Sequence, residues 1–435
     1  MRGCSHSPRS HRICEHLLFP APPNEGNQDS PGFRLIFQGS EWTTLCSACA
    51  DAAPVLAECC DACRRDYLHV DTFGSFDGFG GTKPEPRDRD AGLILVSESV
   101  DIRGALKDRV LAMAPIAKSG RARWLLWTAS RRLVTIELPS GEILARTESI
   151  AVDRDPEPGE VREPAVSLQV SEDGRYAALL LEKKRHGIVV EVATGATIAG
   201  LDRGDYHPEV SEWPFAFTEH RGRTLAVHAI AWNRLGVLDL DARAPFTPDE
   251  TEEEGHDYFL GPLAVSPGGK WIATAGWVWQ PVGIVRVFRL DRWLEGKRSR
   301  EDVSDRSLNQ TGYWWNGSNL WLDDDTLLVP GLGDDDQRMV DAGVLFQMES
   351  ERIGACWPGL PCTTVFPDRA GGLVYSGGDS TSVWETSTGD RVAHAPQLVT
   401  HGFHPAARHT VGIVDPEGIF ALGFLTFRYE SPGTR

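Results

Sequence analysis

The sequence predicts an all-β protein, a seven-bladed β-propeller preceded by a small zinc-stabilised α+β module. Three observations lead to this prediction. A strand–turn–strand pattern returns seven times after residue 91. Glycine (44 residues) and proline (28 residues) are plentiful, which favours turns and short strands over long helices. The third observation is the uneven placement of cysteine, because seven of the nine cysteines lie within residues 1–72.

The repeated pattern is an apolar strand, a polar turn and a second apolar strand, as in "LQVSEDGRYAALLL" and "LAVSPGGKWIATAGW". Its turns supply Ser, Asp, Pro and Gly, which suit tight reversals of the chain. A third strand and often a short fourth one follow, so each unit repeats at steps of about 45 residues, the period of a β-propeller. The second strands begin at Trp124, Tyr176, Thr224, Trp271, Thr326, Leu373 and Thr410.

Some of these units resemble WD-repeat blades. "TSVWETSTGDRVA" resembles the third strand, Trp-acid step and turn of such a blade, and "SEDGRYAAL" and "SPGGKWIATAG" resemble the entry to its second strand. The resemblance covers roughly residues 105–428. It implies a seven-bladed ring that binds partners on its faces, usually without catalysis. We expect Trp124, Trp271 and Trp384 to pack between blades.

The ends of the repeat region suggest how the ring closes. The last unit, which ends in "GIFALGFLTFRY", is short by one strand, and "GLILVSESV" at residues 92–100 is a strand without a unit. Pairing the two would complete the last blade and remove an exposed strand edge. A simple linker strand is the alternative.

The front of the chain has the residues of a zinc module. Thiolate and imidazole are the ligands that zinc prefers, and two residues between cysteines let both sulfurs face one ion. About seventy residues with few aliphatic side chains bury little core, so a structural metal would supply the folding free energy. The candidate ligands are Cys4, His6, Cys14, His16, Cys46, Cys49, Cys60 and Cys63.

The number of ions and their ligand sets remain open. The two knuckles, Cys46 with Cys49 and Cys60 with Cys63, complete one tetrahedral site, and the four earlier ligands could complete a second. Alternatively, Cys14 and His16 join one knuckle. Cys59 is spare or replaces Cys60. We divide the chain into this module (1–72), a Gly/Pro-rich linker (73–90) that we expect to make few contacts, and the propeller (91–435). Within the module we expect a hairpin of 33–37 and 42–45, and a helix at 61–70.

Charge and hydropathy narrow the possible partners. The net charge is −18, and neither the front segment nor the ring has the basic surface that binds nucleic acid or an anionic membrane. No apolar stretch approaches the ~20 residues of a membrane span, and no signal peptide is visible. We therefore expect a cytoplasmic protein with a protein partner. The acidic stretches, such as "DETEEEGHD", lack the spacing of a calcium loop and are interpreted as solvated loops.

The search for a catalytic site finds no linear motif. Because Trp314 and Trp315 are adjacent, an extended chain cannot bury both on one face, and one could line a surface or the central mouth. His401 and His404 are interpreted as turn residues, and Cys356 and Cys362 as free thiols. The leading hypothesis is a non-enzymatic scaffold. The alternatives are a propeller hydrolase or lyase acting at the mouth, and a zinc- or thiol-responsive regulator.

Overall fold

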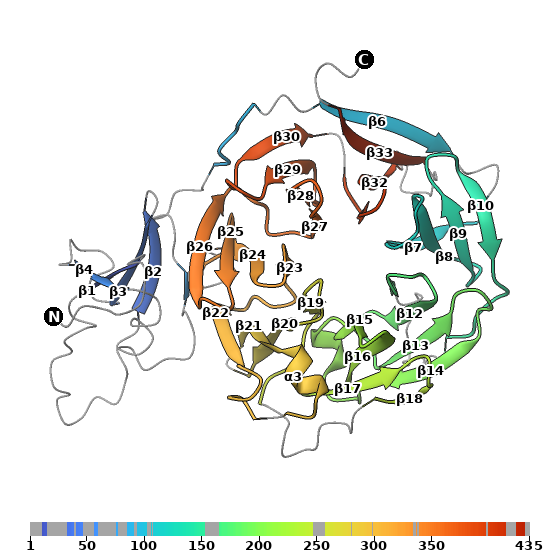
Figure 1. The fold of residues 1–435 in the computed structure, drawn as a ribbon, viewed down its shortest axis with the longest axis horizontal. Helices are drawn as coiled ribbons and strands as arrows, with labels where there is room; N and C mark the ends of the chain where they lie inside the picture. Colours follow the sequence, from blue (N-terminus) through green and yellow to red (C-terminus); the bar gives the residue numbers. More distant parts are fainter. Residues whose placement is uncertain are drawn as a thin grey trace.

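The computed structural model describes residues 85–90, 94–101, 106–152, 165–246, 257–414 and 423–430, with gaps at 107, 280, 298, 334–335, 337–338 and 397–398. It also describes the backbone of five strands in the front segment. These ranges form a ring of sheets around a central space (Figure 1), so the predicted all-β propeller fold is confirmed. The two described helices, η1 (Pro208–Val210) and α3 (Leu290–Leu294), are short.

Six antiparallel blades are each built from four consecutive strands. Blade 1 contains β7 (Val110–Pro115), β8 (Arg123–Thr128), β9 (Leu133–Glu137) and β10 (Glu142–Arg146). Blade 2 contains β11 (Val166–Val170), β12 (Tyr176–Leu181), β13 (His186–Glu191) and β14 (Thr197–Asp202). Blade 3 contains β15 (Phe215–His220), β16 (Arg223–Ala231), β17 (Arg234–Asp239) and β18 (Ala244–Pro245). Blade 4 contains β19 (Leu263–Val265), β20 (Trp271–Val278), β21 (Val282–Arg289) and β22 (Arg306–Gly312). Blade 5 contains β23 (Leu320–Trp321), β24 (Thr326–Leu332), β25 (Val340–Gln347) and β26 (Arg352–Pro358). Blade 6 contains β27 (Val365–Asp368), β28 (Leu373–Ser376), β29 (Thr381–Glu385) and β30 (Arg391–Ala395).

A further four-stranded sheet, the closing sheet, joins the two ends of the ring. It combines β31 (Gly402–His404), β32 (His409–Val414) and β33 (Gly423–Glu430) with β6 (Ile94–Asp101). Strands β6 and β33 pair antiparallel over their whole length, from Gly423 opposite Asp101 to Glu430 opposite Ile94. The predicted pairing of the strand at residues 92–100 with the last unit is therefore confirmed. The six blades differ from the closing sheet because each takes all four strands from one continuous stretch of chain.

The core of the ring lies between neighbouring blades. Every residue of β12, "YAALLL", is buried, because its sheet is covered on both faces. One cluster joins Leu125 and Trp127 of blade 1 to Leu179 and Val190 of blade 2. The three tryptophans predicted as core are confirmed, with exposed fractions of 0 to 1% for Trp124, Trp271 and Trp384.

The polar turns adopt the geometry that their residues predict. In "SEDG" the Ser171 hydroxyl accepts a hydrogen bond from the Tyr176 N–H at 3.0 Å, and Gly174 has a φ of 74°. In "SPGG" the Ser266 hydroxyl accepts from the Trp271 N–H at 3.1 Å, and Gly269 has a φ of 70°. The same turn is thus built twice, with a serine closing it and a glycine at the left-handed position.

The front segment forms a five-stranded sheet in the order β4-β1-β3-β2-β5. Its strands are β1 (His11–Cys14), β2 (Phe33–Gln38), β3 (Glu41–Cys46), β4 (Leu56–Cys59) and β5 (Ser75–Phe76). The predicted hairpin is confirmed, because β2 and β3 pair antiparallel. The predicted helix at 61–70 lies outside the described residues.

The expectation of a linker with few contacts is wrong for residues 85–90, which attach to the outer strand of blade 6. The Arg391 guanidinium donates to both carboxylate oxygens of Asp88, at 2.6 and 2.8 Å. Backbone hydrogen bonds join Arg89 N–H to the Arg391 carbonyl and Arg391 N–H to the Arg87 carbonyl. In "RDR", Arg89 pairs with Glu385 of β29 and with Asp390 in the turn that follows, while Asp88 pairs with Arg391 of β30. Glycine and proline content alone does not reveal these ion pairs.

Candidate binding site at the mouth of the ring

A cavity that we call the mouth pocket lies where connections enter the inner strands β15, β19, β23 and β27. Its volume is about 400 Å³, within the usual range for ligand pockets. Its lining includes Glu212, Leu263, Trp314, Trp315 and Asn319. The inner strands β19, β23 and β27 are neighbours around the centre of the ring (Figure 1).

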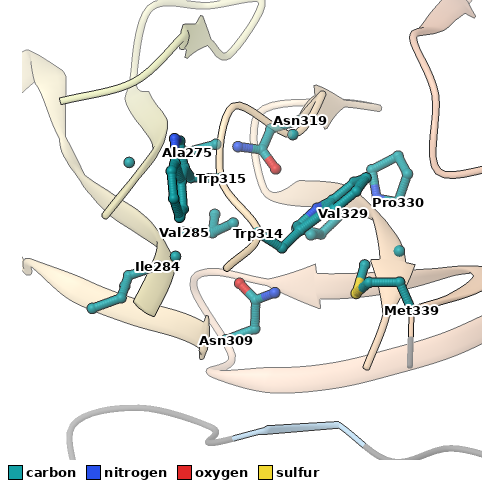
Figure 2. Close-up of a pocket in the computed structure, with 14 residues that line it drawn as sticks. Ala275, Ile284, Val285, Asn309, Trp314, Trp315, Asn319, Val329, Pro330 and Met339 are labelled. Atoms are coloured by element: carbon teal, nitrogen blue, oxygen red, sulfur yellow. The ribbon is translucent and has the colours of Figure 1, made fainter. Parts of the chain in front are cut away.

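The connection "YWWNGSN" between β22 and β23 forms one wall of the mouth pocket. Tyr313 and Asn316 have positive φ values of 55° and 62°, so the chain turns sharply at both ends of the tryptophan pair. Figure 2 shows the Trp314 ring lying towards Pro330 and the Trp315 ring lying beside Ala275. The sequence predicted that one of the two would line a surface or the central mouth, and both line the mouth pocket.

Trp315 and Asn316 are held in place by hydrogen bonds to the connection between β14 and β15. The Trp315 indole N–H donates to the Val210 carbonyl at 2.8 Å. The Asn316 amide oxygen accepts from the Glu212 N–H at 3.0 Å, and the Asn316 N–H donates to the Ala275 carbonyl at 3.1 Å. This wall of the mouth pocket is therefore preorganised.

A row of stacked rings, the aromatic ladder, extends from the mouth pocket across the same face. Tyr206, Phe259, Trp277 and Trp315 stack in order, with ring centroids 5.7, 4.3 and 5.1 Å apart and interplanar angles of 13°, 13° and 23°. Trp279 packs edge-on against Phe259 at 5.1 Å and against Trp277 at 5.2 Å. Such contacts stabilise and orient aromatic side chains beyond simple burial.

Glycine allows the connections that hold the ladder to lie directly on blade 4. A Cβ atom at Gly276 would stand 1.9 Å from the Phe259 carbonyl oxygen, and one at Gly283 would stand 1.5 Å from the Trp314 carbonyl oxygen. Both positions therefore require glycine. Two backbones meet blade 4 here, which brings Phe259 and the tryptophan pair to the same place.

The charge of the mouth pocket comes from one side chain. Among the described residues that line it, Glu212 is the single charged one. Desolvation raises the pKa of Glu212, Glu182 raises it further, and Lys183 opposes the shift. Cys362 also lines the pocket, and burial raises the pKa of its thiol to about 12, so the thiol is neutral at pH 7.

A small recess of about 20 Å³ lies behind the Trp314–Asn319 connection. Asn309 and Asn319 both line it, and Figure 2 shows their amides on opposite sides of the tryptophan pair. The side-chain oxygens of both residues are buried and accept no hydrogen bond from the described protein. Asn309 is 9% exposed. The mouth pocket and the recess share Trp314, Trp315 and Asn319, so they lie on the two sides of one connection.

The predicted zinc ligands are only partly described. Cys14 ends β1 and Cys46 ends β3, and these two strands are parallel neighbours with Ile13 opposite Thr44. Both cysteines therefore lie at the same end of the sheet. Strand β4 runs the other way, and Cys59 is opposite His11 at the far end. Six other predicted ligands lie outside the described residues: Cys4, His6, His16, Cys49, Cys60 and Cys63.

The remaining candidates show no catalytic arrangement. His404 is fully buried against Trp124, with ring centroids 5.8 Å apart, whereas His401 is exposed. Cys356 and Cys362 are free thiols, as predicted. Across the described ranges of the chain, no group of three or more His, Cys, Asp or Glu side chains is placed to hold a metal.

Sequence reasoning missed most of the aromatic ladder. Tyr206, Phe259 and Trp279 belong to "DYHPE", "DYFLGP" and "WVWQP", where aromatic residues lie next to Gly or Pro at strand ends. Aromatic residues beside Gly or Pro at strand ends could have indicated a surface cluster, because side chains in connections are not covered by neighbouring strands.

Comparisons with known proteins add to the description of the fold alone. Neither a protein-family model nor a curated protein sequence matches this chain. The solved structure titled "Structure of U3-55K" is similar over 79% of this chain and 99% of its own, with a TM-score of 0.49 and 13% identity. "Crystal structure of RRP9 WD40 repeats" covers 80% of this chain and 100% of its own, with a TM-score of 0.49 and 12% identity.

No helix in the described ranges is long and apolar enough to cross a membrane.

At 12 to 13% identity, neither solved structure transfers a ligand or a partner to this chain. The assignment rests on strand order: the chain is a β-propeller because its antiparallel four-stranded sheets follow one another around a ring.

Proposed function

We propose that this protein is a non-enzymatic interaction platform that holds a protein partner against the mouth of its ring. The observation that carries the proposal is the exposed aromatic surface beside the mouth pocket, where Trp279 is 49% exposed and Tyr206 is 46% exposed. Rigid, exposed aromatic side chains are typical anchors of protein–protein interfaces. The stacked neighbours Phe259 and Trp277 hold these rings in position before a partner arrives.

The chemistry of the lining also favours binding over catalysis. Besides Glu212 and the neutral Cys362 thiol, the mouth pocket is lined by amide, hydroxyl and apolar groups. A nucleophile would need a neighbouring base, and the residues lining the mouth pocket contain no such pair.

The charge of the protein indicates the kind of partner. The net charge is −18, and the ten residues that precede Asp257 include five acids. Opposite charge speeds encounter and selects partners, so we expect a basic protein segment.

Co-purification with mass spectrometry tests the proposal. We expect a partner that is retained by the unaltered protein and lost from Trp279→Ala, because the substitution removes the exposed anchor and leaves the buried rings of Phe259 and Trp277 in the chain. The matched control is Leu144→Ala on β10, an exposed apolar side chain (38%) on blade 1. Equal retention of every co-purifying protein by all three would contradict the proposal.

We further propose that the closing sheet serves as the seventh blade of the ring. The pairing of β6 with β33 supports this count, because it supplies the fourth strand that the last unit lacks. The pairing covers the edge of β33 that would otherwise be exposed.

We also propose that the front segment is held by structural zinc, as its ligand types and spacing predict. The direction of the strands favours a particular grouping, in which Cys14 joins the first knuckle, since Cys14 and Cys46 end parallel neighbours. With about 4.8 Å between strands and about 3.3 Å per residue, the Cα atoms of Cys46 and Cys59 are roughly 16 Å apart. One tetrahedral ion cannot span that distance, so Cys59 would not share the ion of Cys14 and Cys46, and we propose a separate ion for the second knuckle, which follows Cys59 in the sequence.

A further inference from the structure

We propose that the mouth pocket takes an arginine side chain of the partner, with the Glu212 carboxylate as its counter-ion and the tryptophan pair as its walls. The inference rests on the proposed function and names the group that the mouth recognises. It is carried by three features of the site: the two tryptophans of its lining, Glu212 as the one charged residue among the described lining residues, and the Asn319 amide oxygen, which accepts no hydrogen bond from the described protein.

The walls of the mouth pocket suit a flat cation. Trp315 is fixed on one face by stacking on Trp277 and at its N–H by the Val210 carbonyl. The neighbouring residue Trp314 also lines the pocket. A guanidinium is planar, stacks on aromatic faces and is more weakly hydrated than an ammonium, so two adjacent indoles favour arginine over lysine.

The charge of the lining also indicates a cation. No basic residue accompanies Glu212 among the residues that line the mouth pocket. The Asn316 amide holds the backbone of Glu212 next to Trp315. Desolvation and the nearby Glu182 raise the pKa of Glu212, and Lys183 offsets this shift only in part. A guanidinium bound beside Glu212 would stabilise its charged form.

Two amide oxygens at the recess and the mouth pocket lack a hydrogen-bond partner in the described protein. The side-chain oxygens of Asn309 and Asn319 are both buried and accept no hydrogen bond from the described protein. Guanidinium carries five N–H donors and no acceptor, which suits the Glu212 carboxylate and the unpartnered amide oxygen of Asn319 in the same lining. An anion in the mouth pocket would be repelled by Glu212.

Titration calorimetry with blocked amino acids tests the proposal. The probes are N-acetyl-arginine amide, N-acetyl-lysine amide and the uncharged isostere N-acetyl-citrulline amide. We expect the arginine amide to bind about ten-fold more tightly than the citrulline amide, because only the former forms charge-assisted hydrogen bonds. Glu212→Gln should remove that difference, whereas the control Glu142→Gln on β10 should retain it. Equal binding of arginine and citrulline amides would overturn the proposal, and tighter binding of lysine amide would overturn the choice of arginine.

Competition with the captured partner separates this inference from the proposed function. The arginine amide should displace the partner from the unaltered protein, and Glu212→Gln should capture less of it. Trp279→Ala should lose the partner yet still bind the arginine amide. A partner lost from Trp279→Ala but indifferent to Glu212→Gln and to the amide would overturn the inference and leave the platform intact. If the amide binds but no partner depends on Trp279, the proposed function fails.

Discussion

Gly283 shows how a single missing side chain shapes the candidate site. It lies on β21 opposite Trp277, where the backbone of Trp314 crosses blade 4. Because a Cβ atom there would stand 1.5 Å from the Trp314 carbonyl oxygen, any other residue displaces the connection that forms the wall of the mouth pocket.

We expect Gly283→Ala to destabilise the ring by about 1–3 kcal/mol, the usual cost of overpacking, and to weaken binding of the arginine amide. The control is Gly200→Ala on β14, where a Cβ atom meets nothing within 4 Å. This control should change stability by less than about 1 kcal/mol. Urea denaturation of the three proteins measures their stability, and titration calorimetry measures their binding of the arginine amide. Equal midpoints for Gly283→Ala and the unaltered protein would contradict the close approach.

Single residues also show what the sequence alone can predict. Trp124, Trp271 and Trp384 were predictable as core, because each stands in an apolar strand within a repeat, and strand and burial are local properties. Tyr206 and Trp279 were not, because they belong to connections 73 positions apart and only the ring brings them together. The adjacent tryptophans Trp314 and Trp315 were found since their adjacency itself excludes joint burial in a strand.

At the scale of secondary-structure elements, strand direction carries the information about metal grouping. The spacing of the cysteines in the sequence is the same in both CxxC pairs, so it does not indicate which pair Cys14 joins. The parallel pairing of β1 with β3 and the antiparallel pairing of β1 with β4 place Cys14 near Cys46 and away from Cys59. Pairing over such sequence distances cannot be read from a list of cysteines.

We expect elemental analysis to find two zinc ions per chain. Cys14→Ser and Cys46→Ser should each lose one ion, and the double variant should lose no more than one, because both ligands belong to the same site. Removal of the metal with a chelator should unfold the front segment while the ring keeps its melting temperature. One ion per chain, or full zinc content in Cys14→Ser, would contradict this grouping.

Residues 85–90 illustrate a limit of composition as a guide to elements. Glycine and proline in 73–90 predicted a segment with few contacts, yet Asp88 forms a two-pronged ion pair with Arg391. The charges on "RDR" provided the missing information, but their partners lie about 300 residues away in the sequence.

At the scale of the whole molecule, the ring depends on the pairing of β6 with β33. We expect a chain that begins at residue 91 to fold into a stable ring without zinc. A chain that begins at residue 105 lacks β6 and should leave β33 with an open edge that pairs with other chains. Thermal melting and light scattering compare the two, and equal melting temperatures and solubility would show that β6 is dispensable.

The pairing of β6 with β33 also sets an order in time. Strand β6 is among the first parts of the ring to leave the ribosome, but its partner is made more than 300 residues later. Loop-closure entropy makes this contact the most demanding one in the ring, and such non-local pairing is slow. Throughout synthesis β6 is an unpaired strand awaiting the end of the chain. Premature termination before residue 423 would therefore leave every such chain with the same open seam, however well its earlier blades have folded.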